Sequence, residues 1–169
     1  MPFNKKNLVE FLGIVDGELE RKIELTAVGG TAMTLLDIKN SSIDMDFNLE
    51  EEHATEFKRA LDNLTHGYNI DIYVNGLIFS QQLPDDYIEK RTDIETKYEK
   101  MKLYALHPLD ITVTKIGRLN DRDIEDIRAC IKKQKLSINE IRSRAMEVEY
   151  TGNQENYLIN LRYVLEHLA

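Results

Sequence analysis

Residues 22–49 read KIELTAVGGTAMTLLDIKNSSIDMDFNL, and they carry most of the structural information in this 169-residue chain. Residues 22–28 alternate and are rich in β-forming side chains, which predicts a strand. The pair Gly29-Gly30 ends that strand, and residues 31–38 then have the apolar spacing of a short helix. Residues 42–49 alternate strictly and predict a second strand, in which one face carries the apolar side chains Ile43, Met45, Phe47 and Leu49.

The opposite face of that second strand carries two carboxylates. Asp44 and Asp46 are two residues apart, so both side chains leave the same face, about 7 Å apart along the strand. A third carboxylate, Asp71, lies in the alternating segment 68–74, which predicts another strand. Three convergent carboxylates repel one another unless a cation neutralises them, and their oxygens are ligands that Mg²⁺ prefers. The pattern therefore predicts a divalent-metal site at Asp44, Asp46 and Asp71.

The remaining elements follow from periodicity and capping signals. Helices are predicted over 4–20, from Glu50 to a C′ glycine at Gly67, from His107-Pro108, after Asn120, after Ser137 and over 154–168. Strands are predicted over 100–106 and at the edge 77–79. The expected fold class is α/β (α+β), a mixed sheet flanked by helices. The expected division is a core over 1–107, with a C-terminal helical region over 108–169 packed on it.

Composition narrows the classes of function. The formal charge is −8 from 22 basic and 30 acidic residues, which argues against a protein coated in basic patches for duplex nucleic acid. One cysteine allows no intramolecular disulfide, and no run approaches 18 apolar residues. We therefore expect a cytoplasmic protein that has no membrane partner.

Other candidate groups have ordinary structural explanations. The four histidines lack metal-ligand spacing, and Cys130 lies beside a helical apolar stripe, which predicts a core residue. Asp123 and Asp126 are one helical turn apart and are expected to pair with Arg118 or Arg122. The basic cluster Lys132-Lys133-Gln134-Lys135 is expected to be a solvated helix end, with an RNA-binding patch as the alternative.

Taken together, these motifs resemble the nucleotidyltransferase superfamily of the DNA polymerase β type. The resemblance lies in Val28-Gly29-Gly30, a spacer, and the block Ile43-Asp44-Met45-Asp46-Phe47, with Asp71 matching the third acidic position. A second block, Pro108-Leu109-Asp110 through Lys115 and then residues 122–127, is similar to small prokaryotic relatives. These include the abortive-infection (AbiEii-like) toxin nucleotidyltransferases.

The resemblance implies a reaction in which a nucleoside triphosphate (NTP) loses pyrophosphate and its NMP is attached to a hydroxyl of RNA (tRNA) or protein. It implies that Asp44 and Asp46 bind Mg²⁺ or Mn²⁺, and that Asp71 binds metal and helps activate the acceptor. Gly29 and Gly30 would bind phosphate, because backbone N–H groups can approach it where there is no Cβ. Thr31 and Lys115 would also contact phosphate. The biological context implied is a toxin–antitoxin or defence system with a cognate toxin or antitoxin partner.

Two other functions stay open. A catalytically inactive module of this fold would bind nucleotide or a partner protein, as an antitoxin does. It is suggested by the short chain and by the stretch Lys39-Asn40-Ser41-Ser42, where relatives often carry a basic residue shortly before the two aspartates. A helical adaptor would rest on the C-terminal region alone.

Overall fold

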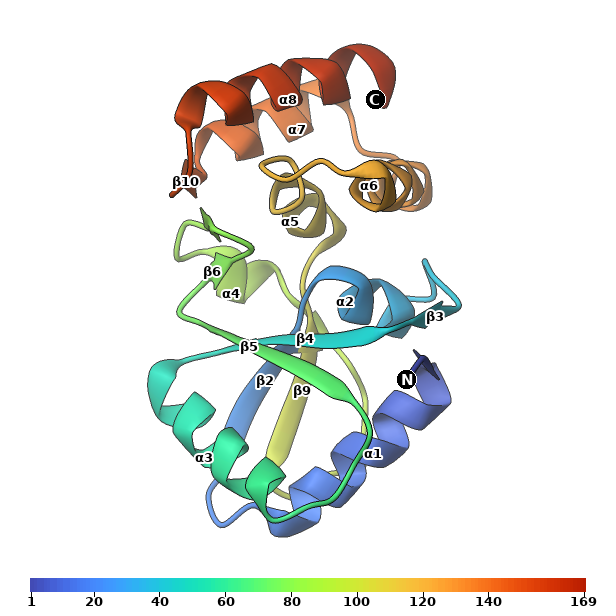
Figure 1. Ribbon diagram of the computed structural model, residues 1–169, viewed down its shortest axis with the longest axis vertical. Coiled ribbons are helices and arrows are strands. Elements are labelled where there is room, and N and C mark those ends of the chain that lie inside the picture. Colours follow the sequence, from blue (N-terminus) through green and yellow to red (C-terminus); the bar gives the residue numbers. More distant parts are fainter. The chain divides into compact units, whose positions relative to one another are not determined.

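The two strands predicted around the glycine pair lie at the centre of a five-stranded sheet in the computed structural model, which describes residues 1–169 (Figure 1). The strand order is β5 (Asn69–Val74), β4 (Asp44–Leu49), β2 (Ile23–Ala27), β9 (Met101–Ala105) and β8 (Thr92–Asp93). The pairs β4–β5 and β2–β9 are parallel, whereas β2–β4 and β8–β9 are antiparallel. This mixed sheet with its helices confirms the α/β fold class.

Three helices accompany this sheet: α1 (Lys5–Glu18), α2 (Gly29–Leu35) and α3 (Glu51–Asp62). The first helix begins with a capping box at Asn4, and α3 contacts α1 as well as β2, β4 and β5. The apolar face of β4 packs on α3, where the rings of Phe47 and Phe57 meet edge to face at 5.5 Å. The short strands β1 (Phe3–Asn4) and β3 (Ser41–Ser42) pair with each other.

Two details of the sequence-based prediction are wrong. Ile43 is 51% exposed, because it lies between β3 and β4 and outside the ladder that buries its neighbours. Gly67 is not the C′ residue of α3, since that helix ends at Asp62 with Asn63 as its cap. No fully buried side chain follows Leu61 before the next strand, so packing does not support a further helical turn there.

A second group of elements is mostly helical. It contains the antiparallel strands β6 (Leu77–Ile78), β7 (Gln81–Gln82) and β10 (Glu149–Tyr150). Its helices are α4 (Tyr87–Lys90), α5 (Pro108–Val113), α6 (Asp121–Gln134), α7 (Ile138–Met146) and α8 (Gln154–His167). The predicted caps at His107, Asn120 and Ser137 are all present.

The chain divides into two compact units. Unit 1 contains Met1–Asn75 and Arg91–Ala105, and unit 2 contains Gly76–Lys90 and Leu106–Ala169. The boundary expected after residue 107 is close to the point at which the chain last passes from unit 1 to unit 2, between Ala105 and Leu106. The segment Gly76–Lys90, however, groups with unit 2. No helix combines the length and hydropathy that crossing a bilayer requires.

Candidate functional site

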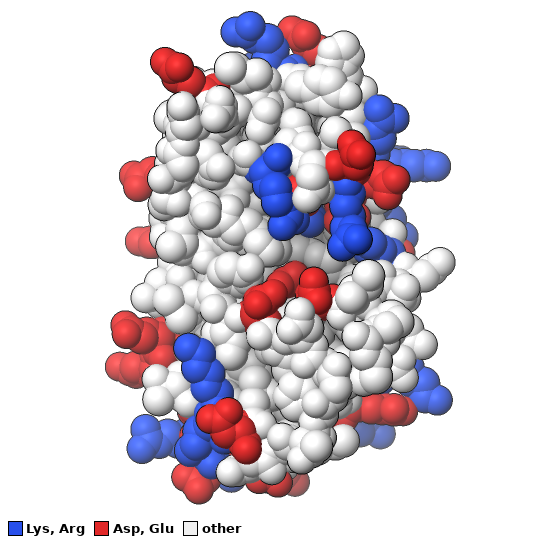
Figure 2. Space-filling model, viewed as in Figure 1, with Lys and Arg blue, Asp and Glu red and all other residues white.

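The three predicted carboxylates share one face of the sheet in unit 1. Asp44 and Asp46 lie on β4, and β5 runs parallel to it with Asp71 directly opposite Asp46. Paired residues on neighbouring strands point to the same side, and the strands are about 4.8 Å apart. Figure 2 shows acidic side chains gathered over β4 and β5. Asp71 is exposed, and Asp44 and Asp46 are half-buried, so the group is open to solvent.

Asn69 is a member of this group that the sequence reasoning missed. It lies opposite Asp44 in the β4–β5 register, and its side-chain amide donates to Asp44 Oδ1 over 3.1 Å. The signal in the sequence is its position two residues before Asp71, which places both side chains on the same face. Asn69 therefore fixes the orientation of the Asp44 carboxylate.

The glycine pair forms a tight turn between β2 and α2. Gly29 has φ = 52°, a conformation that disfavours any residue with a Cβ. A Cβ on Gly30 would lie only 2.9 Å from Ser42 Oγ. The Gly30 carbonyl accepts hydrogen bonds from the hydroxyls of Thr34 and Ser42, at 2.9 Å each. Both glycines are thus needed for the turn itself, and it lies next to β4 because the Val28 N–H donates to the Asp46 carbonyl.

Thr31 is fully buried, and its hydroxyl contacts the backbone of the aspartate strand. The Asp46 N–H donates to Thr31 Oγ1 over 2.8 Å, and the hydroxyl lies 3.3 Å from the Asp44 carbonyl, to which it donates. The hydroxyl that the resemblance assigned to phosphate is therefore engaged in joining α2 to β4.

Lys39 supplies a positive charge at the glycine turn. A Cβ on Gly30 would lie 3.7 Å from Lys39 Nζ. The N–H groups of Ile38 and Lys39 both donate to the Met33 carbonyl, and Asp37 reverses the chain with φ = 60°. This loop brings Lys39 back to the turn from which α2 starts. Sequence reasoning missed the residue because that reversal leaves no clear mark in the sequence.

Lys115, the other predicted phosphate contact, belongs to unit 2, whereas the remaining candidates belong to unit 1. Its side chain is only 4% exposed, and its ammonium pairs with Asp126 at 3.1 Å and Asp123 at 3.5 Å. Arg118 also binds Asp123, at 2.7 Å, as the sequence predicts. Burial alone would raise the pKa of Asp123, but Arg118 and Lys115 outweigh it and lower that pKa. Lys115 is thus part of a buried ion cluster.

Comparison with known proteins identifies the family. A family model described as "Nucleotidyltransferase of unknown function (DUF6036)" matches residues 6–168. The chain belongs to this nucleotidyltransferase family. No curated protein and no solved structure matches it.

Asp44, Asp46 and Asp71 are of a residue type that binds divalent metals, and the backbone register places them on one face. No group of three or more His, Cys, Asp or Glu side chains is arranged to hold an ion as the side chains stand. Mg²⁺ is generally bound through one or two carboxylates together with water and substrate phosphates, and seldom by a complete protein cage. Asp46 and Asp71, opposite each other in the register, are the pair that fits this mode of binding.

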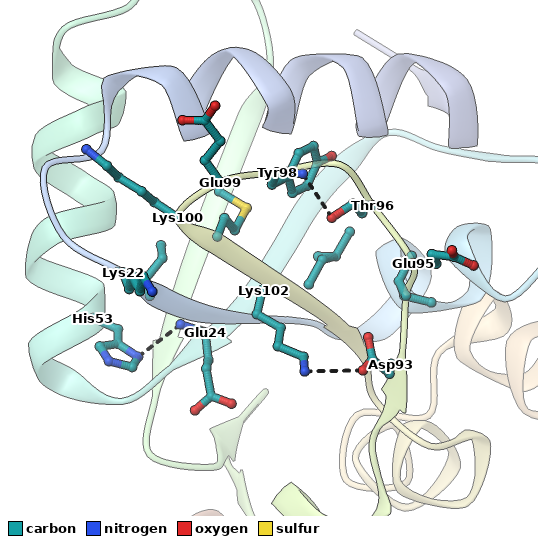
Figure 3. A pocket seen from close by; sticks show the side chains of 14 residues that line it. Lys22, Glu24, His53, Asp93, Glu95, Thr96, Tyr98, Glu99, Lys100 and Lys102 are labelled. Atoms are coloured by element: carbon teal, nitrogen blue, oxygen red, sulfur yellow. Dashed lines mark hydrogen bonds and ion pairs between the residues drawn. The ribbon is translucent and has the colours of Figure 1, made fainter.

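Unit 1 also has a groove of about 630 Å³ that none of the predicted site residues lines. Figure 3 shows its mixed charges, which include an ion pair between Lys102 and Asp93 at 3.4 Å. The charge of Asp93 raises the pKa of Lys102. His53 faces the same groove and accepts the N–H of Glu24 through Nδ1. Lys102 thus pairs with Asp93, and His53 with the backbone of Glu24. We add no residue of this groove to the candidate site.

Proposed function

We propose that the protein is a metal-dependent nucleotidyltransferase that transfers NMP from an NTP to a hydroxyl of RNA, such as tRNA, or of a protein. The observation that carries this proposal is the register that sets Asp46 opposite Asp71, with Asp44 on the same face. We further propose that it acts in the cytoplasm, in a toxin–antitoxin or defence system. Membership of a nucleotidyltransferase family supports the reaction class.

Each part of the site has a chemical role in this proposal. Asp46 and Asp71, with Asp44, would hold Mg²⁺ or Mn²⁺, which supplies charge neutralisation for the triphosphate and the pyrophosphate that leaves. The turn at Gly29 and Gly30 offers backbone N–H groups, and Lys39 offers an ammonium, to the phosphate oxygens.

The transfer itself makes one bond and breaks one. The acceptor oxygen bonds to the α-phosphorus, and the bond from that phosphorus to the oxygen bridging to the β-phosphorus breaks. Asp71 is the exposed carboxylate of the three, so we assign to it the proton of the acceptor hydroxyl. Pyrophosphate then leaves with the electron pair of the broken bond.

A transfer assay tests this function. The purified protein is incubated with α-labelled NTPs, Mg²⁺ or Mn²⁺, and either total RNA or a protein lysate, and label is followed on each acceptor. We expect label on one of the two. Asp46→Asn and Asp71→Asn should reduce it by at least a hundredfold, and Asp62→Asn, an exposed carboxylate at the end of α3, should leave it unchanged. Absence of label from both acceptors with every NTP would contradict the proposal.

An inactive binding module is the second candidate, and one observation favours it. The Asp44 carboxylate accepts a hydrogen bond from Asn69, which competes with a metal for the same oxygen. Calorimetry with NTP, read beside the transfer assay, separates the two functions. The enzyme binds NTP and transfers NMP, whereas an inactive module binds NTP without transfer or, if it binds only proteins, takes up no nucleotide.

A further inference from the structure

Strand β4, which carries Asp44 and Asp46, is paired with β2 only beyond the aspartates, at Phe47 and Asn48. The antiparallel ladder between β2 and β4 includes only the pairs Thr26–Asn48 and Ala27–Phe47. At Val28 the chain of β2 turns away into α2, so the backbone from Asp44 to Asp46 has no further strand on that side. Unpaired backbone groups at that edge would leave the position of both aspartates loosely fixed.

The Thr31 hydroxyl takes the place of two backbone groups that a longer β2 would have supplied. Continued in the antiparallel register of β2 and β4, the ladder would have the Val28 carbonyl accept the Asp46 N–H and the N–H at position 30 donate to the Asp44 carbonyl. Thr31 Oγ1 makes both of these contacts with β4: it accepts the Asp46 N–H over 2.8 Å and donates to the Asp44 carbonyl at 3.3 Å. The side chain of a helix thus continues the ladder past the end of β2.

The same hydroxyl lies one residue after the glycine pair. Thr31 is completely buried, and a branched Cβ restricts its χ1 angle, so its oxygen has little freedom. Ser42 provides a second attachment of this segment, since its hydroxyl donates to the Gly30 carbonyl over 2.9 Å. Together these contacts hold the glycine turn and residues 42–46 at a fixed separation.

We infer that Thr31 is a positioning residue of the nucleotidyl transfer site: its buried hydroxyl sets Asp44 and Asp46 relative to the glycine turn and does not contact phosphate. This inference rests on the proposed function. Transfer needs the metal-binding carboxylates and the phosphate-binding turn in register, and a displacement of about 1 Å can reduce the rate of a reaction a hundredfold.

Three variants test the inference in the transfer assay. Thr31→Val keeps the shape of the side chain and removes the hydroxyl, whereas Thr31→Ser keeps the hydroxyl. Thr112→Val is the matched control, because Thr112 is equally buried and its hydroxyl bonds only within its own helix α5, to the Pro108 carbonyl. We expect Thr31→Val to lower kcat at least tenfold and to raise the Mg²⁺ concentration needed for half-maximal rate, with a smaller change in KM for NTP. Thr31→Ser and Thr112→Val should stay within threefold of the wild type.

A second measurement does not depend on activity. Hydrogen exchange followed by NMR reports on the Asp46 amide, which should exchange at least tenfold faster in Thr31→Val than in the wild type or in Thr112→Val. An unchanged kcat with an unchanged Asp46 exchange rate would overturn the inference, and so would an equal loss of kcat in Thr112→Val. If the wild type transfers no NMP, the proposed function fails, and the exchange rate alone then decides whether Thr31 holds the aspartate strand.

Discussion

A buried ion pair in unit 2, between Arg144 and Asp110, shows charged side chains that stabilise the fold. Arg144 is 3% exposed and binds Asp110, which is fully buried, through two hydrogen bonds of 2.6 and 3.1 Å. A third bond of 2.9 Å reaches Asp86 on the surface. Burial would lower the pKa of Arg144, but these carboxylates raise it well above its ordinary value. The Arg144 guanidinium therefore stays protonated over the whole pH range in which the protein is folded.

The residue-scale prediction concerns this pair. Asp110→Asn should lower the free energy of unfolding by about 3–5 kcal/mol, because it leaves a buried guanidinium without its counter-charge. Asp86→Asn removes a partner that is 45% exposed and should cost less than about 1 kcal/mol. Urea denaturation of the two variants measures both values. If both variants lost the same free energy of unfolding, the buried Asp110 would contribute no more to stability than the exposed Asp86, and the prediction would be wrong.

At the scale of elements, the effect of adding a Cβ can be compared between Gly30, in the turn that begins α2, and Gly17 in α1. Gly30→Ala would bring a Cβ to 2.9 Å from Ser42 Oγ and should shift the turn, so we expect a loss of nucleotidyl transfer of at least tenfold. Gly17→Ala makes the same chemical change in the last turn of α1, where a Cβ meets nothing within 4 Å. That control should keep its activity and gain up to about 1 kcal/mol in stability. Assay and urea denaturation together distinguish the two substitutions.

A second element-scale prediction concerns the connection between α3 and the turn before β2. Glu56 accepts backbone N–H groups of Glu20 and Arg21 and pairs with Arg59. The hydrogen bond from Arg59, with these N–H groups, lowers the pKa of Glu56 from 4.5 to about 2 despite burial. Because the folded-state pKa is depressed, the stabilisation is complete above pH 4.5 and is lost as the pH falls towards 2.

Glu56→Gln should therefore reduce the free energy of unfolding by about 1–2 kcal/mol at pH 7. The difference from the wild type should shrink between pH 4.5 and pH 2. Urea titrations at several pH values measure it. A difference that stays constant down to pH 2.5 would contradict the assignment of the ionised carboxylate.

The elements also show what could be predicted from the sequence. Long periodic segments such as α1, β2, β4 and α6 were predicted well, because their apolar faces repeat over two or more turns or pleats. The strands β1, β3, β7, β8 and β10 have two residues each and cannot display an alternation. Asp44 and Asp46 could be assigned to one face from the period of two alone, whereas Asp71 joins them only through the pairing of β4 with β5. Asn69 and Lys39 depend on the β4–β5 register and on the reversal at Asp37, which only tertiary structure fixes.

On the scale of the whole molecule, ligand binding should stabilise the fold. Two carboxylates, Asp46 and Asp71, would hold the metal only together with the phosphates of the NTP. Metal and NTP should therefore raise Tm only in combination. A hundredfold excess over the dissociation constant adds about 2.7 kcal/mol. In a chain of this length that corresponds to a shift of about 5–10 °C. Differential scanning fluorimetry with Mg²⁺ alone, NTP alone and both gives the result, and Asp46→Asn should abolish the joint effect.

The interleaving of the two units has a consequence for how the protein can be dissected. The chain passes between them at residues 75–76, 90–91 and 105–106, so β8 and β9 reach the sheet of unit 1 only after Gly76–Lys90 has been contributed to unit 2. No single cut yields both units intact. A fragment ending at residue 107 would contain Gly76–Lys90 without the rest of unit 2, on which that segment packs. The complementary fragment would lack β6, β7 and α4. Swapping unit 2 between family members would therefore require two grafts, one at residues 76–90 and the other from residue 106 onward.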